Sequence, residues 1–231
     1  MEVEVSVIIP TYNRIRLLGE AIESVLAQGI ESLEIIVADD GSTDGTGAWL
    51  VEKYPQVRCL ALPHAGVSTA RNHGVEAAQG KWIAFLDSDD CWTSNKLKTQ
   101  LGFAETMVEP TLIFGHYIEF SDFEGDRPSG GNRKIPGYCA GTVLMLKDSF
   151  LRTGGFDPGL SVGEFVDWYD RAKEADIASI LLPDVLLRRR VHSGNTVAPA
   201  GAPSKKYTEA IKAVLERRRK AAAENNAQAS G

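Results

Sequence analysis

Apolar and polar positions along the first half of the chain follow the pattern of a parallel α/β sheet. Four short runs rich in Val, Ile, Leu and Phe predict buried strands at residues 3–9, 33–38, 57–62 and 82–86. Between these runs, apolar residues recur at helical spacing and predict helices at residues 14–28, 44–53 and 67–78. Such a series makes right-handed crossovers, so the loops that follow its strands meet at one edge of the sheet.

The second half has a less regular pattern. It predicts helices at residues 95–107, 148–152 and 164–175, and strands at residues 111–120, 142–146, 177–182 and 185–191. Residues 121–137 are polar and rich in Gly, Pro and Asp, which predicts a long loop. Beyond residue 198 the composition shifts to Pro, Ala and Lys, and we expect a helix at residues 207–223 and a disordered end.

Composition and charge narrow the class of protein. The 231 residues are 43% apolar, enough for a sizeable core, and the formal net charge of -6 argues against general nucleic-acid binding. The scattered Cys59, Cys91 and Cys139 predict reduced thiols. We find no signal-peptide pattern and no apolar run long enough to span a membrane. These features predict a soluble cytoplasmic protein, and contact of the basic terminal helix with a membrane surface stays open.

The predicted strand at residues 82–86 ends in distinctive chemistry. Three carboxylates, those of Asp87, Asp89 and Asp90, follow it within four positions. Clustered carboxylates repel each other and lose hydration when buried, a cost that a divalent cation relieves. Carboxylate oxygens are preferred ligands of Mg²⁺ and Mn²⁺, and ligands of open α/β sheets bind at the carboxyl ends of strands. The pattern therefore favours a metal site, although Asp clusters also form ordinary turns.

Two other loops reach the same predicted edge. Residues 10–14 read Pro-Thr-Tyr-Asn-Arg, and residues 39–44 read Asp-Asp-Gly-Ser-Thr-Asp. A nucleoside diphosphate held through a metal needs a flat aromatic group for the base, an acceptor for base or ribose donors, and carboxylates for the cation. The three loops together contain all of these groups.

Four ordered motifs carry a resemblance to family 2 glycosyltransferases: Val-Ser-Val-Ile-Ile-Pro-Thr-Tyr-Asn at 5–13, Asp-Asp-Gly-Ser-Thr-Asp at 39–44, Ala-Arg-Asn-His-Gly at 70–74 and Phe-Leu-Asp-Ser-Asp-Asp at 85–90. A weaker resemblance continues from residues 154–157 to 191–195, so that it covers about residues 3–196. The resemblance implies a GT-A (Rossmann-like) α/β fold with a mostly parallel central sheet, flanking helices and a smaller acceptor-side sheet portion. It also implies inverting transfer from a nucleotide sugar. The expected domain spans residues 1–198, with a nucleotide-sugar-binding half (1–92), an acceptor-binding half (93–198) and a tail at 199–231.

The resemblance implies roles at the donor nucleotide. Thr11 and Tyr12 would line the base pocket, with Tyr12 stacking on the base. Asp40 would accept a hydrogen bond from the base, commonly uracil, with Asp39 close to the ribose. Arg71 would approach the base or the diphosphate. By their places in the same motifs, the further donor-site candidates are Pro10, Asn13 and Ser88.

The resemblance also implies a metal site, with Mn²⁺ or Mg²⁺ as cofactor. Asp89 would be the direct ligand, Asp87 would lie closer to the ribose and the metal, and His192 would complete the site. The run of arginines at residues 188–190 could offer one guanidinium to the phosphates. Simpler interpretations stay open: a turn at Asp40, or a histidine of the core or of an edge strand at 192. His64 and His73 are interpreted as structural, and His116 is left undecided.

The general base is where the chain departs from the family pattern. The family usually supplies it from a Glu-Asp pair at the start of the helix that follows the Gly-Gly-Phe-Asp segment, and here Phe165 replaces the Asp. Glu164 is the first candidate for the base and Asp167 the second, one turn further along the helix. Alternatively, Glu164 only stabilises the helix dipole.

Two other functions compete with a UDP-sugar-dependent hexosyltransferase. A non-catalytic nucleotide-sugar-binding or scaffold protein is suggested by Phe165. A nucleotidyltransferase ranks lower, because the loop at residues 10–14 lacks the glycines of a phosphate-binding loop. The sequence identifies neither the sugar nor the acceptor, which could be a glycan, a lipid-linked sugar, a small molecule or a peptide, and it does not define the oligomeric state.

Overall fold

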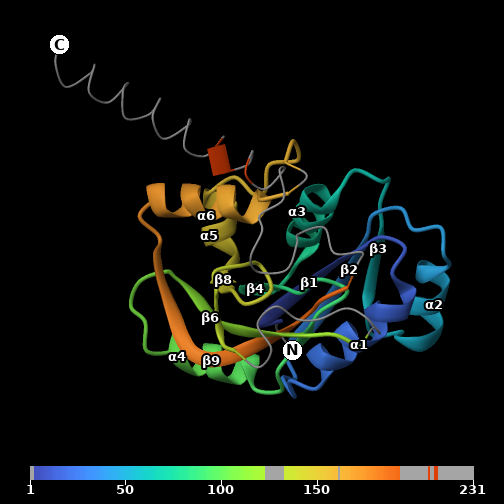
Figure 1. Cartoon of the computed structure of the whole chain (residues 1–231), viewed down its shortest axis with the longest axis horizontal. Helices are drawn as coiled ribbons and strands as arrows, with labels where there is room; N and C mark the ends of the chain where they lie inside the picture. The colour runs from blue at the N-terminus through green and yellow to red at the C-terminus, as the bar shows by residue number, and fades with distance from the viewer. Residues whose placement is uncertain (1–2, 123–132, 161, 193–207, 209–210, 213–231) are drawn as a thin grey trace, which may run out of the picture.

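In the described part of the chain, nine strands form a central sheet with helices on both sides (Figure 1). The computed structural model describes residues 3–122, 133–160, 162–192, 208, 211 and 212. The strand order is β3-β2-β1-β4-β8-β6-β9-β5, and β7 pairs with β6 outside this path. This is the expected α/β architecture with a mostly parallel first half.

The first half confirms each predicted element to within a few residues. In chain order these are β1 (Val5–Thr11), α1 (Ile15–Leu26), β2 (Leu33–Asp39), α2 (Thr46–Lys53), β3 (Arg58–Ala61), α3 (Val67–Ala77) and β4 (Trp82–Phe85). Strand β1 pairs in parallel with both β2 and β4, and β2 pairs in parallel with β3. The loops after these strands therefore lie at one edge of the sheet, as the pattern predicted.

The second half continues the same sheet with mixed strand directions. Its elements are β5 (Cys91–Trp92), α4 (Lys96–Ala104), β6 (Thr111–Phe120), β7 (Ile135–Gly137), β8 (Leu144–Leu146), α5 (Lys147–Arg152), α6 (Glu164–Glu174) and β9 (Ala178–Arg190). Strand β8 runs antiparallel to β4, while β6 and β9 are parallel neighbours. The sheet thus passes without interruption from the first half to the second.

Two predictions for the second half need correction, and one short strand was not predicted. The strands expected at residues 177–182 and 185–191 form one strand, β9, because register shifts near His116 of β6 accommodate the stretch around Pro183 between the two expected strands. The loop expected at 121–137 ends in β7, which pairs with β6. The two-residue β5 is too short to give a periodic signal.

Several other predictions fall wholly or largely outside the described residues. These concern most of the loop at residues 121–137, most of the helix at 207–223, and the tail from 199 with its disordered end. Of the predicted helix, only Thr208, Ile211 and Lys212 are described, and they are helical. Within the part of the chain that the structure describes, no helix is long and apolar enough to cross a membrane.

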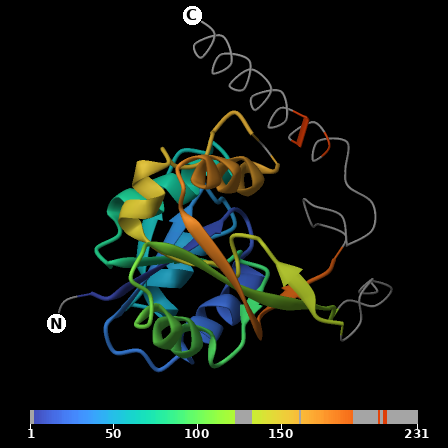
Figure 2. The same cartoon turned by 90° about the vertical axis from the view of Figure 1, so that its left-hand side faces the viewer.

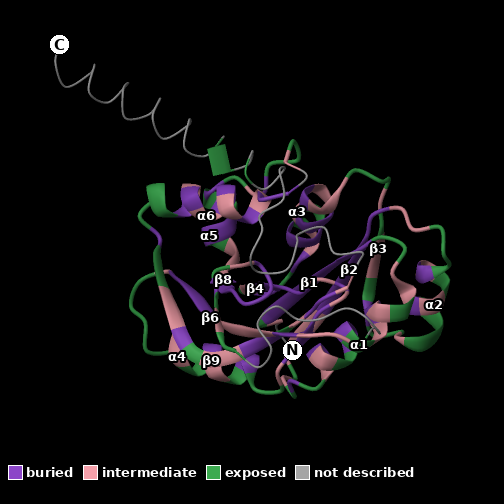
Figure 3. Ribbon diagram, in the orientation of Figure 1, coloured by how far each residue is buried: buried purple, intermediate pink, exposed green. Residues whose placement is uncertain are grey.

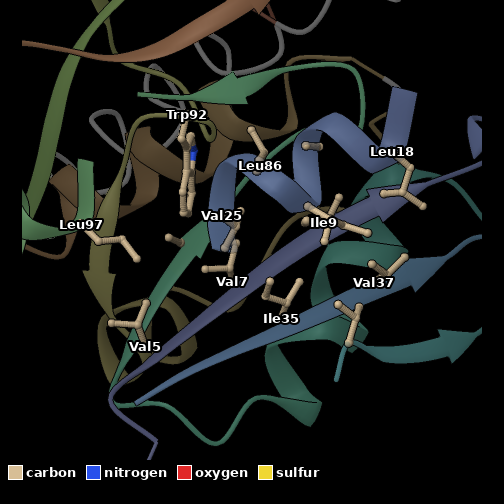
Figure 4. Close-up of a cluster of buried hydrophobic side chains, with 14 of the residues drawn as sticks. Val5, Val7, Ile9, Leu18, Val25, Ile35, Val37, Leu86, Trp92 and Leu97 are labelled. Atoms are coloured by element: carbon tan, nitrogen blue, oxygen red, sulfur yellow. The ribbon is translucent and has the colours of Figure 1, made fainter. Parts of the chain in front are cut away.

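Alternating side chains of β1 build two separate cores. Val7 and Ile9 pack in a cluster with Leu18 and Val25 of α1 (Figure 4). Ile8, which points to the opposite face, packs in a second cluster with side chains of α3, α5 and α6. Complete burial of an aliphatic side chain stabilises the folded protein by about 1.5–3 kcal/mol. Because successive side chains of β1 point to opposite faces, each face of the sheet has apolar side chains that helices must cover.

The helices form two layers that leave the sheet buried between them. Figure 2 shows α3, α5 and α6 on one side of the sheet and α1 and α4 on the other. The middle strands are buried on both faces, as their colour in Figure 3 shows. A parallel strand buried in this way reads as a continuous apolar run, which is why β1, β2 and β4 were readily predicted.

Candidate active site

A cleft of about 380 Å³ opens at the edge of the sheet where β1, β2 and β4 end. Its walls come from the loops after these three strands, from the start of α3, from the residues that lead into α6, and from β9. Its volume is within the usual range for small-molecule sites, and its place agrees with the rule for ligands of open α/β sheets. The cleft is therefore the candidate active site.

An aromatic pair and a buried carboxylate form one part of the cleft. The rings of Tyr12 and His64 stack with their centroids 4.2 Å apart at an angle of 20°. Asp40 accepts hydrogen bonds from the backbone N–H groups of Ala65 (2.8 Å) and Gly66 (2.9 Å), and its Oδ2 lies 2.8 Å from His64 Nδ1. These contacts hold the loop after β3 against the loop after β2.

His64, which we interpreted as structural, lines the cleft and is therefore added to the residues of the candidate site. The only sequence signal was its position in a loop at the same sheet edge. Two further histidines lie elsewhere: His73 pairs with Glu76 on α3, and His116 contacts the carbonyl of Leu182.

Some residues of the loops after β1 and β2 line the cleft, and others make hydrogen bonds that shape the loops. Pro10 and Thr11 line the cleft, and the buried Thr11 Oγ1 has no hydrogen-bond partner among the described residues. Asn13 Oδ1 instead accepts a hydrogen bond from the backbone of Thr43 at 2.8 Å. Asp39 Oδ1 accepts one from the backbone of Ser42 at 2.9 Å. The last two contacts shape the loops that present Tyr12 and Asp40.

Asp89, which lines the cleft, contacts His192, which is distant in the sequence and is not among the lining residues. Asp89 Oδ2 lies 3.1 Å from His192 Nε2, and the guanidinium of Arg14 forms an ion pair with the same carboxylate. Arg14 Nη1 also lies 3.2 Å from His192 Nε2. A carboxylate, an imidazole and a cationic group therefore converge on one point.

This donor set suits Mg²⁺ or Mn²⁺. The described residues contain no cluster of three or more His, Cys, Asp or Glu side chains around one point. Such cations are, however, commonly bound by one or two protein carboxylates and complete their shell with water and substrate phosphates. The convergence of Asp89 and His192 fits that mode of binding once the guanidinium of Arg14 has left the Asp89 carboxylate.

The other two acids of this loop have different surroundings. Asp87 directs Oδ1 toward Arg71, whereas Asp90 is buried and accepts a hydrogen bond from the backbone N–H of Arg190. Burial, and then the charges of Asp89 and Asp87, raise the pKa of Asp90 well above its usual value. Ser88 lines the cleft between them.

Arg71 links α6 to the loop at residues 87–90, which we call the acidic loop. Its side chain is 4% exposed, with Nη2 2.5 Å from Asp87 Oδ1 and Nη1 2.5 Å from Glu164 Oε1. Burial alone would lower the pKa of Arg71, but the carboxylates of Asp87 and Glu164 raise it above its ordinary value. The guanidinium stays charged and fixes the position of both acids.

The two candidate bases differ in their access to the cleft. Glu164 lines it, whereas Asp167 is buried, is not among the lining residues and binds Arg171 Nε at 3.0 Å. Phe165, which replaces the expected Asp, is 6% exposed and packs among the aromatic side chains of Phe114, Phe156, Trp168 and Tyr169. The substitution therefore adds to the core and leaves Glu164 at the cleft.

The three arginines at the end of β9 have separate environments. Arg189 lines the cleft. Arg188 and Arg190 lie against the ring of Phe120, with guanidinium-to-centroid distances of 4.4 and 4.5 Å. Strand alternation explains this division, because alternate residues face opposite sides.

The fold and the cleft define the class of protein, an α/β domain with the GT-A type of fold and a cleft at the carboxyl edge of its parallel strands. The chain matches the model of Glycosyl transferase family 2 over residues 6–150 and belongs to that family. The Escherichia coli protein named UDP-Glc:alpha-D-GlcNAc-diphosphoundecaprenol beta-1,3-glucosyltransferase WfgD is 40% identical over 186 residues, which cover 76% of this chain and 72% of that protein.

Other relatives are longer. An uncharacterized glycosyltransferase of Rickettsia felis is 45% identical over 117 residues, which are 50% of this chain and 19% of that protein. The chain spans at most about half the length of the first curated relatives that it matches. Among solved structures, S. aureus TarS 1-349 in complex with UDP-GlcNAc has a TM-score of 0.72 at 22% identity, covering 91% of this chain and 65% of TarS 1-349. This likeness establishes the fold.

Proposed function

We propose that this chain transfers a sugar from a UDP-sugar to an acceptor hydroxyl with inversion at the anomeric carbon, assisted by a divalent cation. The observation that carries the proposal is that Tyr12, Asp40, Asp87, Asp89 and Glu164 line the same cleft. Its walls carry an aromatic ring and carboxylates, the kinds of side chain that such a transfer uses. The UDP-Glc in the name of WfgD and the UDP-GlcNAc complex of TarS support the choice of nucleotide.

The uracil base would bind at the part of the cleft formed by Tyr12 and Asp40. The ring of Tyr12 is 43% exposed and offers a stacking surface. Asp40 would accept a hydrogen bond from the base, and the unpartnered Thr11 Oγ1 would gain a partner there. Pro10 and Ser88 would complete the donor pocket, while Asn13 and Asp39 would act by shaping its loops.

The diphosphate would lie toward Asp89 and His192, which would hold Mn²⁺ or Mg²⁺ with Asp87 close by. The cation would supply Lewis-acid stabilisation of the charge on the departing nucleoside diphosphate. Because Arg14 binds the same oxygen of Asp89, its guanidinium has to move aside and can then pair with a phosphate. Arg189, at the wall of the cleft, is the second cation placed for that role.

Glu164 would act as the general base. It lines the cleft and would take the proton of the acceptor hydroxyl as that oxygen attacks the anomeric carbon opposite the leaving group. Arg71 would keep Glu164 in place through the contact at 2.5 Å. Asp167 is a weaker candidate, because it is engaged by Arg171 away from the cleft. No covalent intermediate is needed.

Nucleotide-dependent thermal stabilisation tests this proposal. Melting temperatures are measured with UDP-, GDP-, CDP- and dTDP-sugars, each with and without Mn²⁺, for the wild type and for Asp89→Asn. We expect a metal-dependent increase for UDP-sugars that the variant loses. The absence of an increase with any donor would overturn the proposal. An increase without hydrolysis of the donor and without transfer to any of a panel of acceptors would instead support the scaffold alternative.

A further inference from the structure

Arg190, the last residue of β9, is buried in a network that the proposed chemistry does not use. Its side chain is 2% exposed, and it is not among the residues that line the cleft. A buried guanidinium is costly unless its donors are engaged, so the identity of its partners indicates what it does.

Arg190 binds the acidic loop twice. Its Nε donates a hydrogen bond to the carbonyl oxygen of Asp89 at 2.9 Å, and its backbone N–H donates to Oδ1 of Asp90 at 2.8 Å. The loop is further closed by the hydrogen bond from the N–H of Asp90 to the carbonyl of Asp87 at 3.0 Å. One residue of β9 therefore holds the main chain of the loop and a side chain within it.

The rest of the guanidinium is anchored to elements outside the loop. Nη2 pairs with Glu20 Oε2 on α1 at 2.7 Å, and Nη1 pairs with Asp122 just after β6. The group also lies 4.5 Å from the centroid of the Phe120 ring. These contacts fix the plane of the guanidinium, so the position of Nε opposite the Asp89 carbonyl is fixed as well.

The link matters because His192 follows two residues later. Asp89 is held at its carbonyl by Arg190, and its carboxylate oxygen lies 3.1 Å from His192 Nε2. Both candidate ligands are therefore positioned by the same short stretch at the end of β9. Ligating groups need to be held within about 0.5 Å of their productive positions by the groups behind them.

We infer that Arg190 is a positioning residue that sets the distance between the Asp89 carboxylate and the His192 imidazole, and thereby the affinity for the divalent cation. This inference rests on the metal site of the proposed function. A lysine cannot replace Arg190, because a single ammonium cannot reach the Asp89 carbonyl, Glu20 and Asp122 together in a fixed plane.

The test compares Arg190→Lys and Arg190→Gln with Arg188→Gln. Arg188 is the matched control, since it lies on the same strand and against the same Phe120 ring but is exposed. Mn²⁺ affinity is measured by electron paramagnetic resonance with UDP present, and hydrogen exchange is followed in the segment at residues 86–92. We expect both Arg190 variants to bind Mn²⁺ about 10- to 100-fold more weakly and to exchange faster in that segment, and Arg188→Gln to remain within about twofold of the wild type.

The outcomes separate this inference from the proposed function. If the wild type binds Mn²⁺ and the folded Arg190 variants bind it equally well, the inference is wrong and the metal site stands. If the wild type binds no Mn²⁺ with UDP present, the metal site itself is wrong and the inference fails with it. If Arg190→Gln does not fold, Arg190→Lys and Glu20→Gln decide, because the first keeps the positive charge and the second keeps Arg190 itself, while both loosen the guanidinium network. Unchanged affinity in both would overturn the inference.

Discussion

The guanidinium of Arg71 lies 2.5 Å from the carboxylate of Glu164, although 93 positions separate them in the chain. The same guanidinium contacts Asp87 on the acidic loop at 2.5 Å. The buried guanidinium of Arg71 therefore contacts both Glu164, the proposed general base, and Asp87, which is proposed to lie beside the ribose and the metal. Arg71 thus holds the loop that carries Asp87 and the start of α6 in a fixed arrangement. Substitutions in and around the cleft test the roles proposed for its residues.

Replacing Glu164 by Gln removes the proposed base while keeping its size. We expect the rate of transfer to fall by about 10²- to 10⁴-fold, with UDP affinity changed little, because general base catalysis contributes on this order. Steady-state kinetics and UDP titration calorimetry measure the two quantities. Asp167→Asn is the comparison, since Asp167 lies outside the cleft; a larger loss in that variant would assign the base to Asp167.

His64 should contribute to nucleotide binding through Asp40. In His64→Phe a ring is kept beside Tyr12, but the Nδ1 contact to Asp40 at 2.8 Å is lost. Loss of a net hydrogen bond of about 1 kcal/mol corresponds to roughly fivefold weaker UDP binding. Fluorescence or calorimetric titration with UDP measures it. His73→Phe on α3 should leave UDP affinity unchanged, and equal effects of both variants would contradict the prediction.

Arg14 should compete with the cation for Asp89. Its guanidinium forms an ion pair with the oxygen of Asp89 that faces His192, so Arg14→Ala should raise the affinity for Mn²⁺ in the absence of nucleotide. With UDP-sugar bound, the same variant should lose affinity for the donor, because a phosphate partner has been removed. Calorimetric titration of each ligand separates the effects. Arg16→Ala, at an exposed position of α1, is the control, and weaker Mn²⁺ binding by nucleotide-free Arg14→Ala would refute competition.

Lys96 should make stability depend on pH. The side chain is fully buried in α4, with Nζ 2.7 Å from Gln100 Oε1 and 4.2 Å from the centroid of the Trp92 ring. Burial lowers the pKa of Lys96 to about 7, whereas the pKa of a lysine in an unfolded chain is about 10.4. The unfolded chain therefore binds more protons between these values, and the free energy of unfolding should rise with pH by on the order of 1 kcal/mol per unit in that window.

Urea unfolding at several pH values between about 6.5 and 9 checks this dependence. Lys96→Met should remove most of the increase, whereas Lys98→Met, at an exposed position of the same helix, should keep it. The cost of burying the cation is fully present below about pH 7, so the difference between wild type and Lys96→Met should be largest there. An identical slope in all three proteins would contradict the prediction.

The sequence predicted well those features that depend on local patterns. The continuous apolar run before Asp87 identified β4, and the period of the apolar residues identified α1 and α3, because strand and helix burial have different periods. The loops that carry Tyr12, Asp40 and Asp89 could be placed at one edge from the order of the elements alone. All three residues do line one cleft.

What the sequence could not predict depends on contacts between distant segments. Nothing near His64 or Arg190 indicates that they contact Asp40 and Asp89, and nothing in the helix pattern separates Glu164 from Asp167. Phe165, which looked like a loss of function, is a core residue beside Phe156.

The sequence by itself determined the family resemblance, the parallel first half of the sheet and the acidic loop at its edge, because periodicity and short motifs encode them within a few residues. Only the tertiary structure decided which charges meet. Asp89 and His192 are 103 positions apart, and Arg190 and Glu20 are 170 apart. Such pairs form where packed strands and helices bring their side chains together, and that packing is a property of the whole sheet and not of any local segment.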